Sequence, residues 1–210
     1  TFYHSNIYLN IIIMLLIITG GIGFLVWGDI GTHKHRIRRY SLQSKVVLMT
    51  SAVLIVLPAL YFFFCEYDHE TIHDRTIHSL FQSVTTRTAG FNTTDLAAMD
   101  ESGTAIMVIL MLIGGSPGST AGGMKTATFA VLFLSAITVF SRRNDVQCFK
   151  RRISDETVRS AGAVLFMYLV LFFTSGVIIS RVENLPLLTC LFETSSAIGT
   201  VGLSLGITSG

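Results

Sequence analysis

The sequence predicts an all-α integral membrane fold in which a unit of span, half-helix, loop and span is repeated but incomplete. Three observations support this prediction. Half of the 210 residues are hydrophobic and only 13% are charged, against roughly 25% charged in soluble domains. Several apolar stretches reach the ~20 residues needed to cross a bilayer. A short polar motif that contains a glycine occurs twice, each time after one of these stretches.

Uninterrupted apolar stretches occupy residues 7–27, 46–64 and 161–179, and each predicts a membrane-spanning helix. A fourth stretch, 105–140, is long enough but is interrupted by the glycine-rich segment 114–123. The chain begins with Thr1 and stops at Gly210, just after a turn-like run. We therefore expect it to be a fragment of a longer protein, cut at both ends.

The charges predict which ends of the spans face the cytoplasm. Eleven of the 15 basic residues lie in two segments: Lys34, Arg36, Arg38, Arg39 and Lys45, then Arg142, Arg143, Lys150, Arg151, Arg152 and Arg159. The segments between them carry mostly acids. The positive-inside rule makes both basic segments cytoplasmic and implies four crossings of the cell membrane. Because topology explains the basic residues, we expect no nucleic-acid partner. Membrane lipid and a cytoplasmic protein partner remain alternatives for these segments.

An internal repeat is the most informative feature. Residues 80–91 (LFQSVTTRTAGF) align without gaps on 192–203 (FETSSAIGTVGL). The alignment pairs Ser83 with Ser195, and an apolar residue follows each glycine. Each copy comes after an outward-going span and a stretch too short to cross the membrane again. The repeat therefore predicts two re-entrant half-helices, each followed by a loop at membrane depth.

A loop at membrane depth leaves backbone N–H and C=O groups unpaired, so it is tolerated only where it is buried in protein or lines a watery path. Rings of loop carbonyls can replace the hydration shell of a permeating cation. Ordinary helix packing is the alternative explanation for clusters of Ser, Thr and Gly. Two copies in the same topological position favour a cation pore.

Three strings resemble the Trk/Ktr/HKT superfamily of potassium transporters. Residues 81–93 resemble the third filter segment of the Ktr-type membrane subunit, 114–126 the glycine-rich interruption of the following helix, and 192–208 the fourth filter. The resemblance covers essentially the whole chain. It implies a K⁺ channel-like fold of four span–pore-loop–span units around one pathway.

The resemblance also implies how the chain is divided. Residues 1–28 would be the last helix of the second unit, 29–45 a cytoplasmic loop, and 46–140 the third unit, with a pore helix at about 76–86 and filter 87–91. Residues 141–158 would be a second cytoplasmic loop. Residues 159–210 would be part of the fourth unit, with a pore helix at about 187–198 and filter 199–203.

The expected activity is K⁺ transport without an enzyme reaction and without a cofactor in this chain. Whether Na⁺ also passes, or is coupled as in a symport, is left open. The selectivity filter would use the backbones of two groups of residues: Arg87, Thr88, Ala89 and Gly90, then Gly199, Thr200, Val201 and Gly202. The expected partners are a second full-length copy and cytoplasmic RCK-type nucleotide-binding regulatory subunits.

The glycine-rich interruption would act as an intramembrane gate below the filter. A kinked helix is the simpler alternative, but ten residues with five glycines and a proline exceed what a kink needs. The expected gating residues are Gly114, Gly115, Ser116, Pro117, Gly118, Ser119, Thr120, Ala121, Gly122, Gly123 and Lys125. Lys125 either extends to the interface or holds the loop.

Two further features need an explanation. A guanidinium on the pore axis would repel cations, so Arg87 is expected to point behind its loop, with Glu193 as the candidate partner. His69-Glu70-Thr71-Ile72-His73 matches the HExxH pattern of zinc proteases, in which two histidines one helical turn apart bind the metal. An integral-membrane zinc metalloprotease is therefore the alternative function.

Overall fold

The computed structural model describes residues 7–34, 36–142, 145–149 and 151–206. Within these residues the regular secondary structure is helical apart from one short hairpin and an isolated bridge. Residues 1–6 and 207–210 of the predicted terminal units, and Arg143 and Lys150 of the second basic segment, lie outside the described residues. The helices are α1 (Ile7–Ile22), α2 (Phe24–His33), α3 (Leu42–Tyr61), α4 (Ile72–Thr85), α5 (Glu101–Leu112), α6 (Thr126–Phe140), α7 (Asp155–Glu183) and α8 (Leu187–Gly199). Strands β1 (Gln147–Cys148) and β2 (Arg151–Arg152) pair antiparallel.

Two helices are long and apolar enough to span a membrane among the described residues. One is α3 with its π-helical extension Phe62–Glu66, and the other is α7. Their N-termini are fixed by serine side chains, because Ser41 accepts a hydrogen bond from the Ser44 N–H and Ser154 accepts one from the Thr157 N–H. Most of the apolar side chains of α7 are exposed, as expected for a helix that faces lipid.

The first predicted span is not one helix. α1 and α2 meet at Gly23 with an angle of 93°, so the prediction of one continuous helix here is wrong. Taken together, the two helices are still long and apolar enough for a broken span or a re-entrant loop. The backbone of Gly23 takes φ 89° and ψ 149°, which ends one helix and starts the next. An isolated stretch of apolar residues cannot reveal this bend, because the contacts that stabilise it come from residues about 95 positions later.

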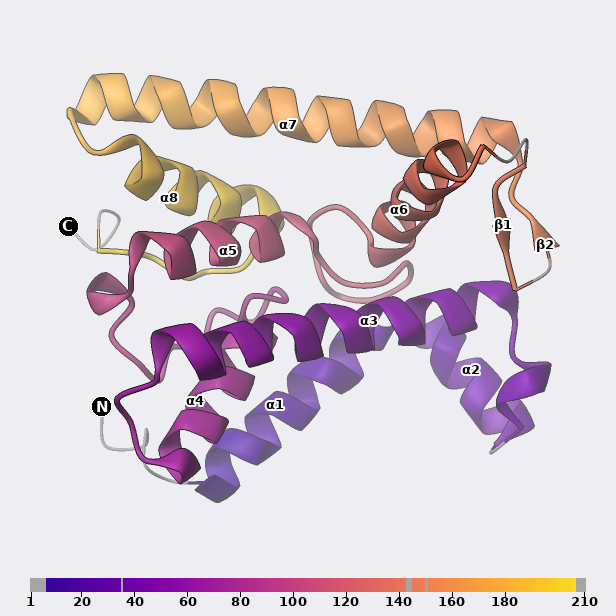
Figure 1. Ribbon diagram of the computed structural model, residues 1–210, viewed down its shortest axis with the longest axis horizontal. Helices are drawn as coiled ribbons and strands as arrows, with labels where there is room; N and C mark the ends of the chain where they lie inside the picture. The colour runs from indigo at the N-terminus through magenta and orange to yellow at the C-terminus, as the bar shows by residue number, and fades with distance from the viewer. Residues whose placement is uncertain (1–6, 35, 143–144, 150, 207–210) are drawn as a thin grey trace.

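The two half-helices are held in the same way. α4 packs against α3, the span before it, and against α1. α8 packs against α7, the span before it, and against α5. Figure 1 shows these two groups, with α4 and α1 below α3 and with α8 and α5 beneath α7. The repeat in the sequence is therefore matched by a repeat in packing.

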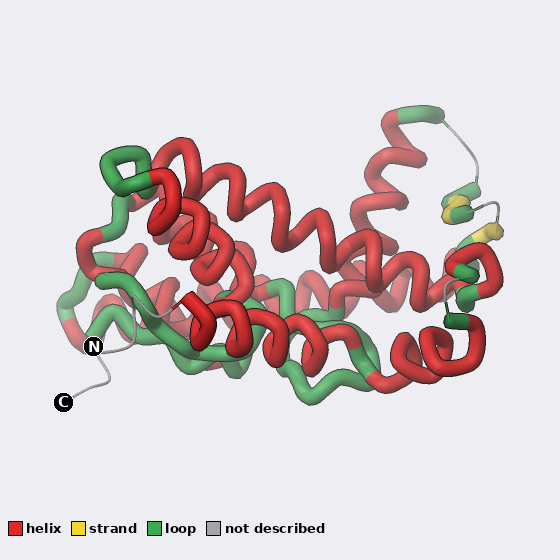
Figure 2. The backbone as a smooth tube through the Cα atoms, turned by 90° about the horizontal axis from the view of Figure 1, so that it is seen from below, coloured by secondary structure: helices red, strands yellow, loops and turns green. Residues whose placement is uncertain are grey.

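Both half-helices overlap the predicted pore helices, with one shifted boundary. α4 begins at Ile72 rather than at residue 76, because the Thr71 side chain accepts a hydrogen bond from the Asp74 N–H and starts the helix earlier. α8 covers Leu187–Gly199, close to the predicted 187–198. Figure 2 shows that irregular backbone also lies between the helices along the length of the molecule, and not only at its ends.

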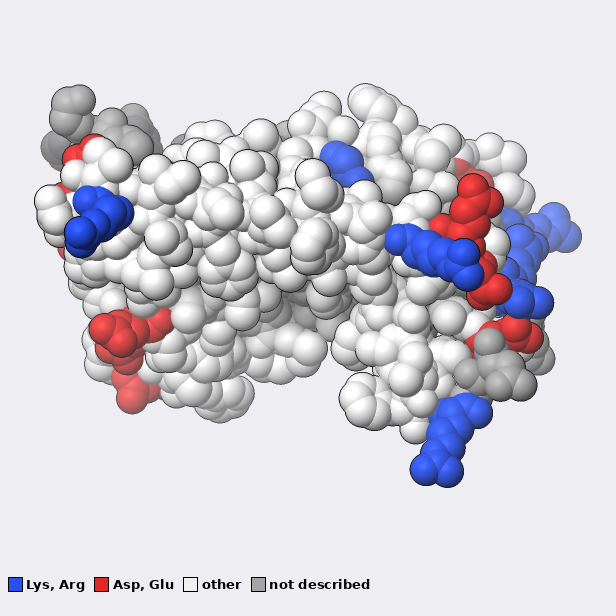
Figure 3. All heavy atoms as spheres, turned by 90° about the horizontal axis from the view of Figure 1, so that it is seen from above, with Lys and Arg blue, Asp and Glu red and all other residues white. Residues whose placement is uncertain are grey.

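The charged residues lie mainly at the two ends of the long axis. On the face drawn in Figure 3, most Lys and Arg gather at the end where β1 and β2 lie, and the surface between the two ends is almost uncharged. An uncharged belt between polar ends is what a bilayer-embedded protein requires.

Candidate functional site: two facing loops and a glycine-rich segment

The two repeated loops adopt the same unusual backbone. Thr88 and Gly90 have φ values of 60° and 71°, and their sequence equivalents Thr200 and Gly202 have 54° and 92°. In each loop the residue between these two is not in the left-handed region. The sequence alignment therefore holds at the level of individual backbone angles.

The left-handed threonines are a second sign of a specialised site. A β-branched residue with positive φ is an outlier, costs of order 1–3 kcal/mol, and persists only where its surroundings over-determine it. Thr88 and Thr200 occupy aligned positions, so the same strain occurs twice. Such strain is concentrated at functional sites.

The loops meet at their glycines. A Cβ atom placed on Gly90 would overlap the carbonyl oxygen of Val201, and one placed on Gly202 would lie 3.8 Å from the Gly90 Cα. Only glycine combines the required φ with this approach. Residues more than 100 positions apart thus bring two carbonyl-bearing loops into direct contact.

The amides of the second loop are tied to its half-helix. The Val201 N–H donates to the Ser196 carbonyl at 2.8 Å, and the Gly202 N–H donates to the Ser196 hydroxyl oxygen at 3.1 Å. In the first loop, the Ala89 N–H donates to the Thr85 carbonyl at 3.2 Å. The hydrogen bonds among the described residues leave the carbonyl oxygens of 88–90 and 200–202 without a donor. These oxygens remain available to coordinate a cation.

Ser196 was not singled out by the sequence, because its aligned residue in the first copy is the apolar Val84. Apolar contacts also hold the second loop. Val201 and Leu203 are buried in the same cluster as Met111 and Phe192.

The predicted partner of Arg87 is wrong. Its guanidinium donates to the hydroxyl and the carbonyl oxygen of Ser51 on α3, at 3.3 and 3.5 Å. Glu193 accepts instead from the Ser204 hydroxyl and the Leu205 N–H, both at 2.7 Å. The side chain of Arg87 is buried against its own preceding span. Glu193 instead accepts hydrogen bonds from the segment that follows its own loop. The spacing of charges along the sequence does not predict this interaction.

The Arg87–Ser51 contact leads to a stability prediction. Replacing Ser51 by alanine removes one of the acceptors of a buried guanidinium, which should cost about 1–3 kcal/mol. We expect a lower thermal unfolding midpoint for the purified intact protein in detergent. The matched control is Thr174→Ala on α7, an exposed hydroxyl that bonds only carbonyls of its own helix. An equal shift for both variants would contradict a special role for Ser51.

The glycine-rich segment separates α5 from α6 and folds back on itself. Gly114 N–H donates to the Met124 carbonyl at 2.9 Å, and Met124 N–H donates to the Leu112 carbonyl at 3.1 Å. Ile113 and Met124 form a β-bridge. A Cβ on Gly114 would overlap the Gly122 carbonyl. The interruption is therefore an ordered loop, closed at its base by a parallel bridge, rather than a kinked helix.

This loop touches the second filter-like loop. A Cβ on Gly122 would overlap the Thr200 hydroxyl, and one on Gly123 would lie 3.5 Å from the Gly199 Cα. The Lys125 ammonium donates to the Ala121 carbonyl at 2.6 Å, which joins the two ends of the loop's last turn. Of the two expectations for Lys125, the structure thus has it holding the loop.

The zinc-site alternative is not supported by the geometry. His69 and Glu70 precede α4, whereas His73 lies in its first turn, so the two histidines are not one turn apart on a helix. Glu70 accepts from His78 Nδ1 at 2.8 Å, which occupies the carboxylate that would activate water. Within the described residues no group of three His, Cys, Asp or Glu side chains is placed to hold a metal ion.

Tyr67, just after the first of the two long spans, connects the linker before α4 to the segment after the first loop. Its hydroxyl lies 3.2 Å from the Thr94 hydroxyl. Burial raises the pKa of Tyr67 to about 12, so the phenol stays neutral at physiological pH. This contact joins the linker to the segment that follows the first loop.

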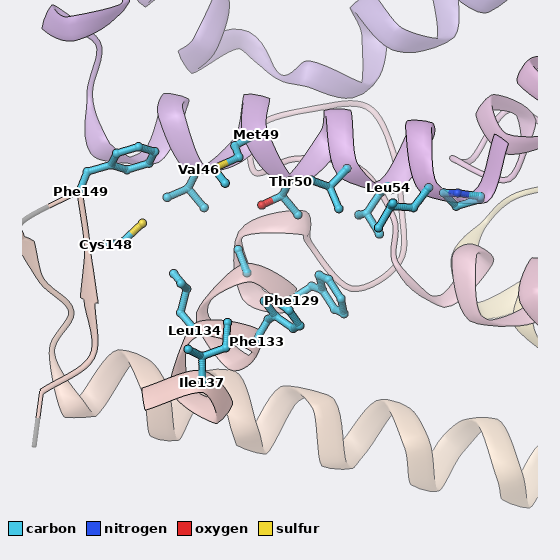
Figure 4. Close-up of a pocket in the computed structure, with 14 residues that line it drawn as sticks. Val46, Met49, Thr50, Leu54, Phe129, Phe133, Leu134, Ile137, Cys148 and Phe149 are labelled. Carbon is cyan, nitrogen blue, oxygen red and sulfur yellow. The ribbon is translucent and has the colours of Figure 1, made fainter. Parts of the chain in front are cut away.

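Two hollows differ in what they can accept. A groove of about 460 Å³ between α3, α6 and the hairpin is lined by apolar side chains apart from Thr50 (Figure 4), and it offers a cation no oxygen ligands beyond that hydroxyl. A second hollow, about 580 Å³, lies beside the second loop and is lined in part by Glu193, Thr200 and Gly202. The hollow that carries several polar side chains is the one that adjoins the repeated motif.

Comparison with known proteins agrees with this arrangement. A family model described as a cation transport protein, TrkH, matches residues 1–210. The chain is 36% identical to the potassium/sodium uptake protein NtpJ of Enterococcus hirae, over 97% of this chain and 47% of that protein. It is 37% identical to the Ktr system potassium uptake protein B of Bacillus subtilis, over 95% of this chain and 46% of that protein.

A crystal structure of the potassium transporter TrkH from Vibrio parahaemolyticus has the same fold, with a TM-score of 0.74 at 18% identity, over 95% of this chain and 46% of that chain. The chain thus spans about half the length of the relatives it matches. These relatives are named as uptake proteins or transporters and not as enzymes. The predicted all-α membrane fold and the predicted Trk/Ktr resemblance are confirmed. The chain is a multi-pass membrane protein and belongs to the TrkH family of cation transport proteins.

Proposed function

We propose that this chain supplies two ion-coordinating loops and an intramembrane gate to a potassium uptake transporter. The observation that carries the proposal is the pair of loops at 87–90 and 199–202, which share their positive-φ pattern, face each other at Gly90 and Gly202, and keep carbonyl oxygens without a donor among the described residues. The relatives named above as potassium uptake proteins supply the identity of the ion.

The proposed chemistry is exchange of water for backbone oxygen. A cation enters the loops only if carbonyls replace its hydration shell at comparable free energy, and the spacing and number of those carbonyls then favour one ion over another. The loop amides are hydrogen-bonded to the half-helices, and Val201 and Leu203 are buried in the apolar core. Both interactions keep the carbonyl positions constant. Transported K⁺ is the substrate; both passive flow and Na⁺-coupled symport are compatible with this arrangement.

The proposed gate is the loop 114–123 together with Lys125. It lies against the second loop through the contacts of Gly122 with Thr200 and of Gly123 with Gly199. An ordered loop beside the second loop would narrow the path that an ion takes from the filter toward the basic end of the molecule. Its opening would be a switch between two packed arrangements, as loop gates commonly are.

We further propose that the basic end faces the cytoplasm, in agreement with the positive-inside rule. The intact subunit would pair with a second copy and would dock cytoplasmic RCK-type nucleotide-binding subunits at this end. Relatives named as part of a Ktr system support a membrane subunit that works with others. Any nucleotide would be bound by that partner.

The test is uptake by the intact protein that contains this chain, expressed in a host that lacks its own K⁺ uptake. We expect Rb⁺ and K⁺ uptake above that of an empty-vector host, with no zinc in the purified protein. Glu70→Gln serves as the control for the protease alternative and should leave uptake unchanged. Absent uptake from protein that reaches the membrane would contradict the proposal.

A further inference from the structure

The bend between α1 and α2 is the starting point. We call Gly20–Phe24 the elbow. Its two helices meet at 93° across a single residue, Gly23. The Trp27 indole N–H donates to the Thr19 carbonyl at 3.0 Å, which ties the two arms together. The elbow is thus a defined conformation and not a frayed helix end.

The elbow holds the turn of the glycine-rich loop from both sides. The Ser116 N–H donates to the Gly21 carbonyl at 3.0 Å, and the Phe24 N–H donates to the Gly118 carbonyl at 3.1 Å. Between these bonds, a Cβ on Gly23 would lie only 2.7 Å from the Pro117 carbonyl oxygen. The loop turn at 117–118 therefore fits against a position where no side chain fits.

These bonds make loop and elbow depend on each other. Breaking a helix leaves its last carbonyls and the next helix's first N–H groups without intrahelical partners. At membrane depth, each unpaired group costs several kcal/mol. Gly21 and Phe24 obtain their partners from the loop. The loop therefore cannot leave the elbow unless the angle between α1 and α2 changes or water molecules replace the hydrogen bonds that the loop makes.

The other end of α2 is fixed to the basic segment. The Asp29 carboxylate accepts from the Ser41 N–H at 2.9 Å and from the Ser44 hydroxyl at 2.6 Å. Both serines begin α3, directly after the basic residues Arg36–Arg39. α2 is therefore bonded at one end to the basic segment and at the other to the glycine-rich loop.

We infer that the elbow keeps the glycine-rich loop in place and that α2 transmits movements of the basic segment to it. Gly23 is then a positioning residue of the gate, although it touches neither filter-like loop. This inference rests on the proposed gating function and adds the element that controls it.

A reversible cross-link tests the inference in the intact transporter, reconstituted in liposomes. Gly20 lies near Thr120, since a Cβ on Gly20 would lie 4.0 Å from the Thr120 hydroxyl oxygen, the atom whose place a cysteine sulfur would take. Because a disulfide requires two Cβ atoms only a few ångströms apart, this pair is chosen for the cross-link. Gly20→Cys and Thr120→Cys are combined after Cys65, Cys148 and Cys190 are replaced by alanine. Oxidation should lower Rb⁺ uptake about fivefold or more, within the usual range of coupling effects, and dithiothreitol should restore it. Each single-cysteine protein is the control. A cross-link that forms without changing uptake would overturn the inference.

A second variant decides the matter if the cross-link does not form. Gly23→Ala places a methyl group against Pro117 and should release the loop. Uptake per molecule should then rise about threefold, while K⁺/Na⁺ discrimination stays the same. Gly28→Ala in the same helix is the matched control, because nothing lies within 4 Å of its added Cβ. Unaltered uptake per molecule in Gly23→Ala would refute the role of the elbow. Absence of uptake in the unmodified protein would instead refute the proposed function.

Discussion

Replacing Gly90 by alanine in the intact transporter is expected to lower K⁺/Na⁺ discrimination about tenfold, equivalent to about 1.4 kcal/mol. The added methyl group overlaps the Val201 carbonyl oxygen and occupies a residue with φ 71°. One loop or both must therefore shift. Because selectivity depends on the number and spacing of coordinating carbonyls, a shift that leaves the pathway open still reduces discrimination. The measurement is the ratio of K⁺ to Na⁺ uptake.

Gly202→Ser tests the same pair from the other side. Space is less tight there, with 3.8 Å between the added Cβ and the Gly90 Cα, but φ is 92° and any side chain is strained. The expected loss of discrimination is in the same direction and smaller. Gly162→Ala on α7, whose added Cβ meets nothing within 4 Å, should behave like the unmodified protein. A Gly202→Ser protein that transports K⁺ with full selectivity would contradict the filter assignment.

Deleting residues 114–123 is expected to raise ion flux about threefold to tenfold, a change of roughly 1 kcal/mol in the closed-to-open balance. The deletion is feasible because Ile113 and Met124 already form a bridge, and bridged residues lie only ~5 Å apart, against 3.8 Å for chain neighbours. Joining them reconnects α5 to α6 with little movement of either helix.

The measurement is Rb⁺ flux into liposomes that contain equal amounts of each protein. Thr120→Ala, which shortens one exposed side chain of the same loop, is the control for a change in the loop without its removal. Flux equal to that of the unmodified protein after the deletion would show that the loop does not restrict the pathway.

The amino-acid sequence by itself determined the membrane-embedded helical class, the two loop motifs and the break between α5 and α6. These features depend on local composition: apolar runs of bilayer length, and glycines at fixed positions of a repeat. The first expectation for Arg87, that it turns away behind its loop, follows from charge alone, and its contacts with Ser51 agree with it.

Only the tertiary structure decided which groups meet. The elbow at Gly23 exists because loop residues 116 and 118 supply hydrogen bonds to it, and the glycine alone does not specify a 93° bend. The partner of Arg87, the tie from Ser196 to Gly202, and the contact of Gly122 with Thr200 likewise join residues whose relative positions depend on the packing of whole helices. Composition determines that a segment lies in the membrane, whereas satisfying each buried polar group depends on neighbours that are distant in the sequence.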